Sequence, residues 1–251
     1  MKMLSLFYKV EIGISLIPFL IVILLTGYYK LFFTYFIIVF IHELGHVVVA
    51  SAFNVKVDKI TINIFGCSAS LEDHKYLDFY KQIFIFLAGP LTYFISSFLI
   101  DKLYANEVIS LVTYYKAIFT NKYVLIFNLL PIFPLDGGRI LKLIIERFFT
   151  FKASKIISLF ISFIFITLFI VYTSECKQYL IYIFTILNFI SEVASIEKEW
   201  KHFLISRYYF INKYKDKIHN KNDLYIYKDN YCIKEKRILN EKQMIERILK
   251  N

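Results

Sequence analysis

The chain has 251 residues, a formal net charge of +10 and a hydrophobic content of 58%. A soluble globular domain contains about 45–50% apolar residues, so this chain is too apolar to be one. The excess lies in long blocks, several of which reach the roughly 20 residues needed to cross the hydrocarbon core of a bilayer. The composition therefore excludes an ordinary soluble domain and predicts a polytopic membrane protein.

Six apolar segments are predicted to be membrane spans of an all-α domain. Their approximate ranges are 12–29, 31–53, 83–101, 117–133, 155–172 and 178–196. The first segment follows Lys2 and Lys9 but offers no small-x-small cleavage site, so we expect a retained signal anchor. The predicted domains are a six-span membrane domain over 1–196 and a basic cytoplasmic tail over 197–251.

Basic residues are concentrated in alternate connections between these segments. The segment 54–82, the connection 137–155 and the tail after 197 are rich in Lys and Arg, whereas the intervening connections carry few. This alternation follows the positive-inside rule for six spans with both termini in the cytoplasm. The net charge therefore reflects membrane topology and attraction to the lipid bilayer, and we do not expect nucleic-acid binding.

The sequence period changes after the second apolar segment. In "KITINIF", Ile60, Ile62 and Ile64 alternate with polar residues, which is typical of a β-strand. Gly66 then interrupts the run, and "CSASL" predicts a second short strand. We expect a β-hairpin over 55–71 that lies at the membrane surface.

The tail is rich in Lys and Tyr and contains neither Gly nor Pro. "LYIYKDNYCIKEK" predicts two short strands around Asp229 and Asn230. "NEKQMIERILK" predicts a helix, with Asn240 as its N-cap and Gln243 at the capping-box position. The tail is either a small strand–strand–helix module or a partly ordered basic segment.

The second apolar segment, "FIIVFIHELGHVVVASAF", carries three ionisable side chains near its middle. His42 and His46 are four residues apart, so a helix places both imidazoles on one face, where they can bind one zinc ion. Glu43 lies beside them and can accept a proton from metal-bound water. Ionisable residues in a span cost about 2.5–3.5 kcal/mol each on insertion scales, so a purely structural polar cluster is a poor alternative.

A catalytic zinc site needs one more protein ligand. Asp136, in "NLLPIFPLDGGRI", closes the fourth apolar segment, and the Pro and Gly residues around it predict a broken helix end. By the predicted topology, Asp136 and the two histidines lie at similar depth toward the cytoplasm. Glu192 on the last apolar segment is the alternative third ligand.

The pairing of H-E-L-G-H with N-x-x-P-x-x-P-x-D-G resembles the site-2 protease family of intramembrane zinc metalloproteases. The resemblance covers about residues 1–196 and includes "AGP" at 88–90. It implies one Zn²⁺ ion, with ligands and a catalytic acid–base that match residues already singled out: His42, His46, Asp136 and Glu43. It also implies that Asn128 helps to hold the substrate chain.

The motifs and the short layout look most like family members that process a precursor sigma factor in sporulation. The resemblance therefore implies cleavage of a membrane-associated protein substrate, in or near its membrane segment, with removal of an N-terminal pro-sequence. It also implies inhibitory membrane proteins as partners and a location in the cytoplasmic membrane or around the forespore. An extended substrate could pair with the predicted hairpin by strand addition, which makes Ile62, Ile64 and Gly66 candidate substrate-binding residues.

Three other functions compete with a protease. A zinc-binding regulator or scaffold would lack the base or a ligand, whereas this chain keeps Glu43 and three candidate ligands. Membrane-embedded H-E-x-x-H peptidases with soluble substrates take a ligand from a later E-x-x-x-H-like helix, but Glu192 is followed at that spacing by Ile196. A transporter would leave the Asp-Gly motif unexplained.

Overall fold

The computed structural model describes residues 10–12, 25, 27, 29–55, 57–63, 66–71, 78–176, 179–209, 217–219, 224–234 and 237–250. Within these ranges the chain is mostly helical and groups into two compact units, Met1–Leu129 and Leu130–Asn251. The second unit thus includes the last two predicted spans together with the tail. The membrane domain over 1–196 and the separate tail stay predictions.

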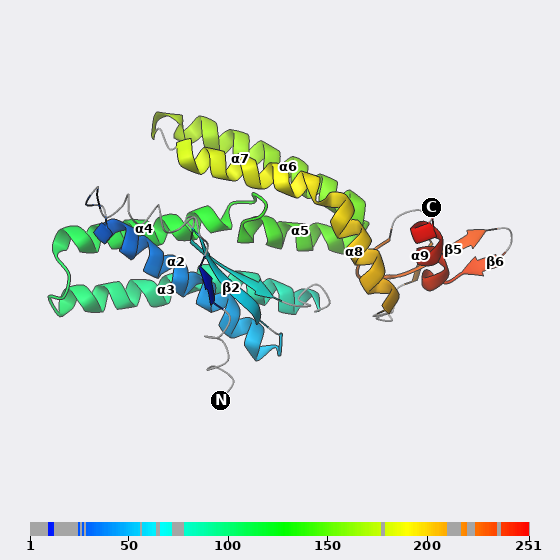
Figure 1. The fold of residues 1–251 in the computed structure, drawn as a ribbon, viewed down its shortest axis with the longest axis horizontal. Coiled ribbons are helices and arrows are strands. Elements are labelled where there is room, and N and C mark those ends of the chain that lie inside the picture. Colours follow the sequence, from blue (N-terminus) through cyan, green and yellow to red (C-terminus); the bar gives the residue numbers. More distant parts are fainter. Residues whose placement is uncertain are drawn as a thin grey trace. The chain divides into compact units, whose positions relative to one another are not determined.

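Three helices form the described helical part of the first unit (Figure 1): α2 (Tyr29–Ala52), α3 (Phe79–Ala105) and α4 (Leu111–Leu129). α2 packs against both α3 and α4. A Cβ on Gly45 of α2 would lie 2.5 Å from the Thr92 methyl group and 2.7 Å from the Ala88 carbonyl oxygen of α3. The missing side chain therefore lets α2 approach α3 closely, and this contact brings the histidines of α2 against α3.

A three-stranded sheet belongs to the same unit. β1 (Val10–Ile12) pairs parallel with β2 (Val57–Asn63), which pairs antiparallel with β3 (Gly66–Leu71). The two predicted strands are thus present and paired, whereas β1 was not predicted, because three residues are too few to show an alternating pattern. The position of this sheet at the membrane surface stays a prediction.

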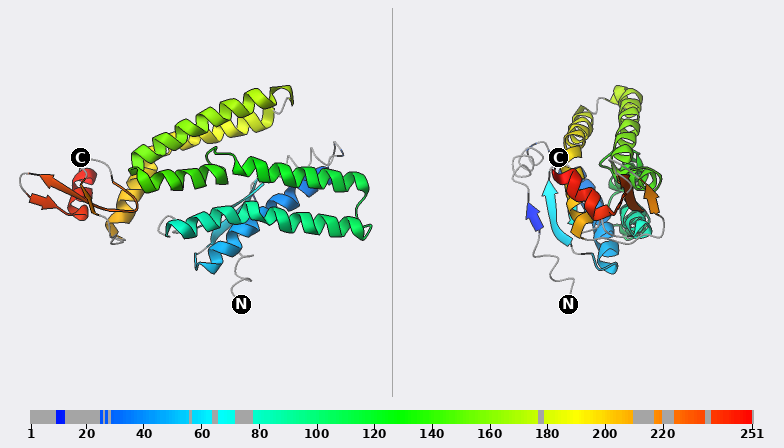
Figure 2. Two further views of the ribbon diagram at one scale, coloured as in Figure 1. Left: turned by 180° about the vertical axis from the view of Figure 1, so that it is seen from behind. Right: turned by 90° about the vertical axis from the view of Figure 1, so that its right-hand side faces the viewer.

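Four helices begin the second unit: α5 (Asp136–Phe148), α6 (Phe151–Thr173), α7 (Tyr179–Ala194) and α8 (Ile196–Tyr209). α6 and α7 contact each other and lie side by side in Figure 1 and in the left view of Figure 2, and α5 and α8 also contact α6. α5 and α6 are separate helices, because the chain is extended at Thr150, just ahead of the first turn of α6.

The described part of the tail contains β4 (Lys217–His219), β5 (Asp229–Lys234), β6 (Arg237–Leu239) and α9 (Glu241–Lys250). β5 lies between a parallel β4 and an antiparallel β6. α8, α9 and the start of α6 share one apolar core, formed by Phe151, Trp200, Leu204, Leu224, Met244 and Ile245. The described tail therefore packs as a small module onto α6 and α8.

Two details of the tail test its sequence patterns. The capping box is confirmed, because the backbone N–H of Gln243 donates to Asn240 Oδ1 and that of Asn240 donates to Gln243 Oε1, both at 3.1 Å. The two short strands predicted around Asp229 and Asn230 are displaced along the chain, since both residues lie within β5, whose antiparallel partner β6 begins at Arg237. The buried Asn230 amide instead bonds the backbone of Tyr225 through both its oxygen and its nitrogen, so it organises the segment before the strand.

Among the described residues, three helices are long and apolar enough to cross a membrane: α2, α3 and α6. α7 includes a shorter apolar stretch, Ile181–Ala194. α4 is not among the three and carries Lys116, Asn121 and Lys122 in its middle. The predicted span 12–29 lies mostly outside the described residues, so the number of six spans stays a prediction.

Candidate active site

α2 places the two histidines of H-E-x-x-H on one buried face. His42 and His46 are only 5% and 7% exposed, and their Nε2 atoms are 3.3 Å apart. Nδ1 of His46 lies 2.7 Å from the backbone carbonyl oxygen of Ile85 on α3. Because a carbonyl oxygen can only accept, Nδ1 carries the proton, and Nε2 is the ring nitrogen of His46 that can act as a metal ligand.

This arrangement fits a shared zinc ion. Zinc–nitrogen distances of about 2.0–2.1 Å around a tetrahedral centre place two ligand nitrogens about 3.3–3.4 Å apart. The observed separation of the Nε2 atoms of His42 and His46 is 3.3 Å. A metal-binding histidine usually donates its other ring N–H to a carbonyl or carboxylate, as His46 does to Ile85.

Gly89 of α3 leaves the space that the two imidazoles occupy. A Cβ at this position would overlap Nε2 of His46 and would lie 2.7 Å from Nε2 of His42. Gly89 is fully within a helix, where glycine is otherwise unfavourable by about 1 kcal/mol relative to alanine. Its close approach to both rings explains why a glycine stands here.

Glu43 follows His42 on α2 and is partly buried. At about 100° per residue, its side chain leaves the helix about 100° from His42 and about 60° from His46 around the axis. Glu43 therefore borders the face that carries the two imidazoles without sharing it. This position suits a group that exchanges protons beside a metal rather than one that binds the metal.

Asp136 begins α5 in the second unit and is 5% exposed. α4 ends at Leu129, and the segment 130–135 is not helical, so the predicted break in the helix is confirmed. A Cβ on Gly138 would lie 2.5 Å from the Ile132 carbonyl oxygen, so this glycine lets the first turn of α5 pack against the preceding segment. A carboxylate in the first turn of a helix is also favoured by the helix dipole.

Two other predicted polar residues have partners within their own units. Nδ2 of Asn128 donates to the Val124 carbonyl oxygen at 3.0 Å, one turn earlier in α4. The Glu192 carboxylate accepts from Lys155 Nζ at 2.7 Å. This ion pair occupies Glu192 and argues against its alternative assignment as a metal ligand.

The predicted substrate-binding residues of the sheet are only partly described. Ile62 lies in β2 and is in register with Ile12 on one side and Cys67 on the other. Because its strand is paired on both sides there, β2 cannot accept a further strand at Ile62. Gly66 begins β3, which is an edge strand of the described sheet. Ile64 lies outside the described residues.

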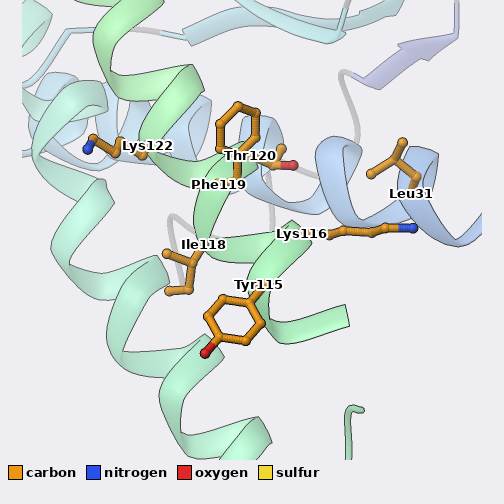
Figure 3. A pocket seen from close by; sticks show the side chains of 7 residues that line it. All are labelled: Leu31, Tyr115, Lys116, Ile118, Phe119, Thr120 and Lys122. Atoms are coloured by element: carbon orange, nitrogen blue, oxygen red, sulfur yellow. The ribbon is translucent and has the colours of Figure 1, made fainter. Parts of the chain in front are cut away.

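A cavity of about 500 Å³ lies elsewhere in the first unit (Figure 3). It is lined by Leu31 of α2 and by residues of α4, namely Tyr115, Lys116, Ile118, Phe119, Thr120 and Lys122. Figure 3 shows the two lysine side chains extending in different directions. The lining of this cavity contains no histidine or carboxylate.

Comparison with known proteins assigns the chain to a family. The model of peptidase family M50 matches residues 30–107 and 101–171, which together are more than half of the chain and include both sequence motifs. The chain belongs to peptidase family M50. The predicted resemblance is confirmed, and the protein is a membrane zinc metalloprotease of the site-2 protease type.

Individual relatives agree with this assignment. Stage IV sporulation protein FB of Bacillus subtilis is 29% identical over 226 residues, which are 86% of this chain and 77% of that protein. A zinc metalloprotease of Methanocaldococcus jannaschii is 31% identical over 158 residues, which are 59% of this chain and 46% of that protein. The solved site-2 protease from the same organism has a TM-score of 0.53 at 24% identity and covers 74% of this chain and 89% of that chain, so the two share a fold.

Membership in this family fixes the general function of the M50 peptidase. It is an integral membrane enzyme, in agreement with the apolar helices α2, α3 and α6, and it acts on a membrane-associated protein substrate. Two contributors to its site were not assigned from the sequence. Gly89 was noted only as part of "AGP". The Ile85 carbonyl could not be predicted as an acceptor, because every residue has a backbone carbonyl, whatever its side chain.

Proposed function

We propose that this M50 peptidase holds one zinc ion with His42, His46 and Asp136 and uses Glu43 to transfer protons during peptide hydrolysis. Two imidazoles and one carboxylate, all three buried, are a donor set that could hold a metal ion. The observation that carries the proposal is the 3.3 Å separation of the two histidine Nε2 atoms, with the far nitrogen of His46 bonded to a backbone carbonyl.

Zinc in such a site supplies Lewis acidity, which lowers the pKa of a bound water to about 7 and polarises the scissile carbonyl. Glu43 accepts the proton that the attacking water loses and returns it to the leaving amine. The Ile85 carbonyl keeps His46 in one tautomer and orientation throughout. Gly89 provides the open space in which the imidazoles keep their spacing.

The substrate we propose is a precursor sigma factor that loses its N-terminal pro-sequence by cleavage in or near a membrane segment. The support is the likeness to stage IV sporulation protein FB over 86% of this chain. The alternation of basic connections supports a site that faces the cytoplasm, with both termini on that side. A location in the membrane around the forespore and control by an inhibitory membrane protein belong to the same proposal.

Substrate must be extended before its backbone can be hydrolysed, and strand addition is one way to hold it extended. We assign this role to the edge strand β3, which begins at Gly66, because β2 is already paired on both sides at Ile62. Asn128 at the end of α4 is proposed to hold the same extended segment through its side-chain amide.

The deciding experiment compares Glu43→Gln with the wild-type chain in liposomes that contain a precursor sigma factor. We expect the rate of cleavage to fall by about 10³-fold, within the range for loss of a general base, while bound zinc stays near one per chain. Glu197→Gln serves as the matched control, because Glu197 is exposed on α8. Undiminished cleavage by Glu43→Gln would contradict the mechanism, and a wild-type chain that binds zinc and precursor without cleaving would support a regulator instead.

A further inference from the structure

The segment that leads into Asp136 is held from α6. The backbone N–H of Phe133 donates to Ser162 Oγ at 3.0 Å, and Ser162 Oγ in turn donates to the Ser158 carbonyl oxygen at 2.8 Å. Ser162 is only 1% exposed. A non-helical segment is therefore tied by its main chain to a buried hydroxyl, three residues before the carboxylate proposed to bind zinc.

The side chain of Phe133 is held by two cations. The Nζ atoms of Lys142 and Lys155 lie 5.3 Å and 4.8 Å from the centroid of its ring. Both distances are within the roughly 6 Å over which a cation is attracted to an aromatic face. The attraction is stronger in a site that excludes water, and the two lysine side chains are only 14% and 1% exposed.

Carboxylates from three helices fix these ammonium groups. Lys155 Nζ lies 2.7 Å from Glu192 Oε2 and 3.0 Å from Glu199 Oε1. Lys142 Nζ lies 3.4 Å from Glu199 Oε2 and 3.6 Å from Glu146 Oε1. Glu199 thus contacts both lysines, with one carboxylate oxygen for each.

Stability alone is a weak reason for this network of buried lysine–glutamate ion pairs. Buried ion pairs often add little, because the cost of removing charges from water offsets their attraction, and apolar replacements of similar volume can be as stable. Their directional contacts do, however, fix where the attached groups lie. Here the attached group is the Phe133 ring, on the segment 130–135 that sets the start of α5.

We propose that Phe133, Lys142, Lys155 and Glu199, which we call the Phe133 clamp, position the Asp136 carboxylate for metal binding. The inference rests on the proposed function, because it requires Asp136 to be a zinc ligand. Glu199 lies on α8, whose Trp200 and Leu204 belong to the core of the tail module. The fold of the tail therefore determines where the Glu199 carboxylate holds the two lysines.

The test measures zinc affinity by chelator competition, together with kcat and KM, on the full-length chain in detergent. Phe133→Leu keeps the apolar bulk and removes the aromatic face, and Glu199→Gln keeps the shape and removes the charge. We expect each to lower zinc affinity and kcat by about 10-fold to 100-fold, as for other residues that orient a metal ligand, with KM little changed. Phe133→Tyr keeps an aromatic ring, so its zinc affinity and kcat should stay within about threefold of wild type. The same is expected of the exposed control Glu197→Gln.

Three results separate the clamp from its premise and from simple destabilisation. If Asp136→Asn keeps wild-type zinc affinity, the ligand assignment itself is overturned. If Asp136→Asn loses zinc while Phe133→Leu and Glu199→Gln keep wild-type affinity and kcat, the clamp alone is overturned. The last comparison uses Ile166→Ala, which creates a cavity in α6 one turn beyond Ser162. If this variant loses as much zinc affinity as Phe133→Leu at an equal fall in Tm, the effect is one of stability and the clamp is overturned.

Discussion

The two units of the M50 peptidase bury polar side chains in different ways. In the first, two buried side chains of α2 and α3 bond backbone carbonyls: His46 bonds that of Ile85, and Thr92 bonds that of Gly89 at 2.7 Å. The second unit buries hydroxyl groups of this kind too, such as that of Ser162, but it also buries charged side chains that neutralise one another, as Lys155 does with Glu192. A single N–H or O–H needs one acceptor, whereas buried charges need countercharges brought together from several helices.

This difference has a functional counterpart. A metal-binding histidine is usually oriented through its other ring nitrogen, as His46 is by the Ile85 carbonyl through Nδ1. Groups that only position a segment can saturate one another, as the lysines and glutamates of the second unit do. The histidine pair should therefore be disturbed most by added side-chain volume, and the lysine–glutamate network by the removal of a charge.

The largest effect should come from filling the space beside the histidines. Gly89→Ala puts a Cβ where Nε2 of His46 lies and 2.7 Å from Nε2 of His42, so at least one ring must move. A displacement of about 1 Å at a catalytic site can cost about 100-fold in rate, and we expect a loss of at least that size. The measurements are the rate of precursor cleavage and the zinc content of the purified variant.

The control is Leu91→Ala on the same helix, because Leu91 is 56% exposed. This substitution should leave both cleavage and zinc content near wild type. If Gly89→Ala cleaves as fast as Leu91→Ala, the imidazoles tolerate the added methyl group. The histidine pair would then not depend on the missing side chain at position 89.

A second prediction concerns charge in the other unit. Lys155→Met removes the ammonium group that Glu192 and Glu199 share and leaves two carboxylates near each other. Removing one member of a buried ion pair typically costs 3–5 kcal/mol, and because both carboxylates are about one-fifth exposed we expect about 3 kcal/mol, at the low end. Denaturant titration of the variant in detergent measures the loss, with Lys198→Met on the exposed face of α8 as the control.

The double variant Lys155→Met with Glu192→Gln sharpens this test. Removing one carboxylate as well lowers the repulsion, so the double variant should be more stable than Lys155→Met alone. If the single variant is as stable as wild type, the charges of the second unit are not balanced against one another, and the contrast between the two units fails.

The sequence predicted the features whose determinants lie close together in the chain. H-E-x-x-H spans one helical turn, so the pairing of His42 with His46 could be derived from helix geometry alone. The break before Asp136 followed from the Pro and Gly residues around it, and the capping box of α9 from Asn240 and Gln243. In each case the physical cause is local.

Features that depend on tertiary packing were not predictable. Gly89 and His46 are 43 positions apart, and their contact requires α2 and α3 to meet at Gly45. In the sequence, Lys155 is one of several basic residues in a predicted cytoplasmic connection, whereas in the structure it is buried. Its partner Glu199 lies 44 residues later on another helix, so the sequence pattern around Lys155 does not reveal the ion pair. The short strand β1 and the double pairing of β2 likewise depend on segments that are distant in sequence.

The smallest expected effect is a dependence of stability on alkaline pH. Burial lowers the pKa of Lys142, but the carboxylates of Glu146, Glu199 and Glu192 together outweigh burial and raise this pKa above its ordinary value. A cation whose pKa is higher in the folded state contributes stability that is fully present below its unfolded pKa of about 10.4. That contribution is lost as the pH rises from there through the folded pKa, with a slope of at most about 1.4 kcal/mol per pH unit.

Lys142→Met should remove this dependence, so that its free energy of unfolding falls less steeply than that of wild type above about pH 10.4. Lys198→Met is the control again, because Lys198 is exposed on α8, and this variant should follow the wild-type curve. Denaturant titrations of the three proteins between pH 8 and pH 11.5 measure the difference. Parallel curves for Lys142→Met and wild type would mean that the Lys142 ammonium is no better stabilised when folded than when unfolded. The second unit would then hold its lysines by packing alone, and charge would no longer distinguish it from the first.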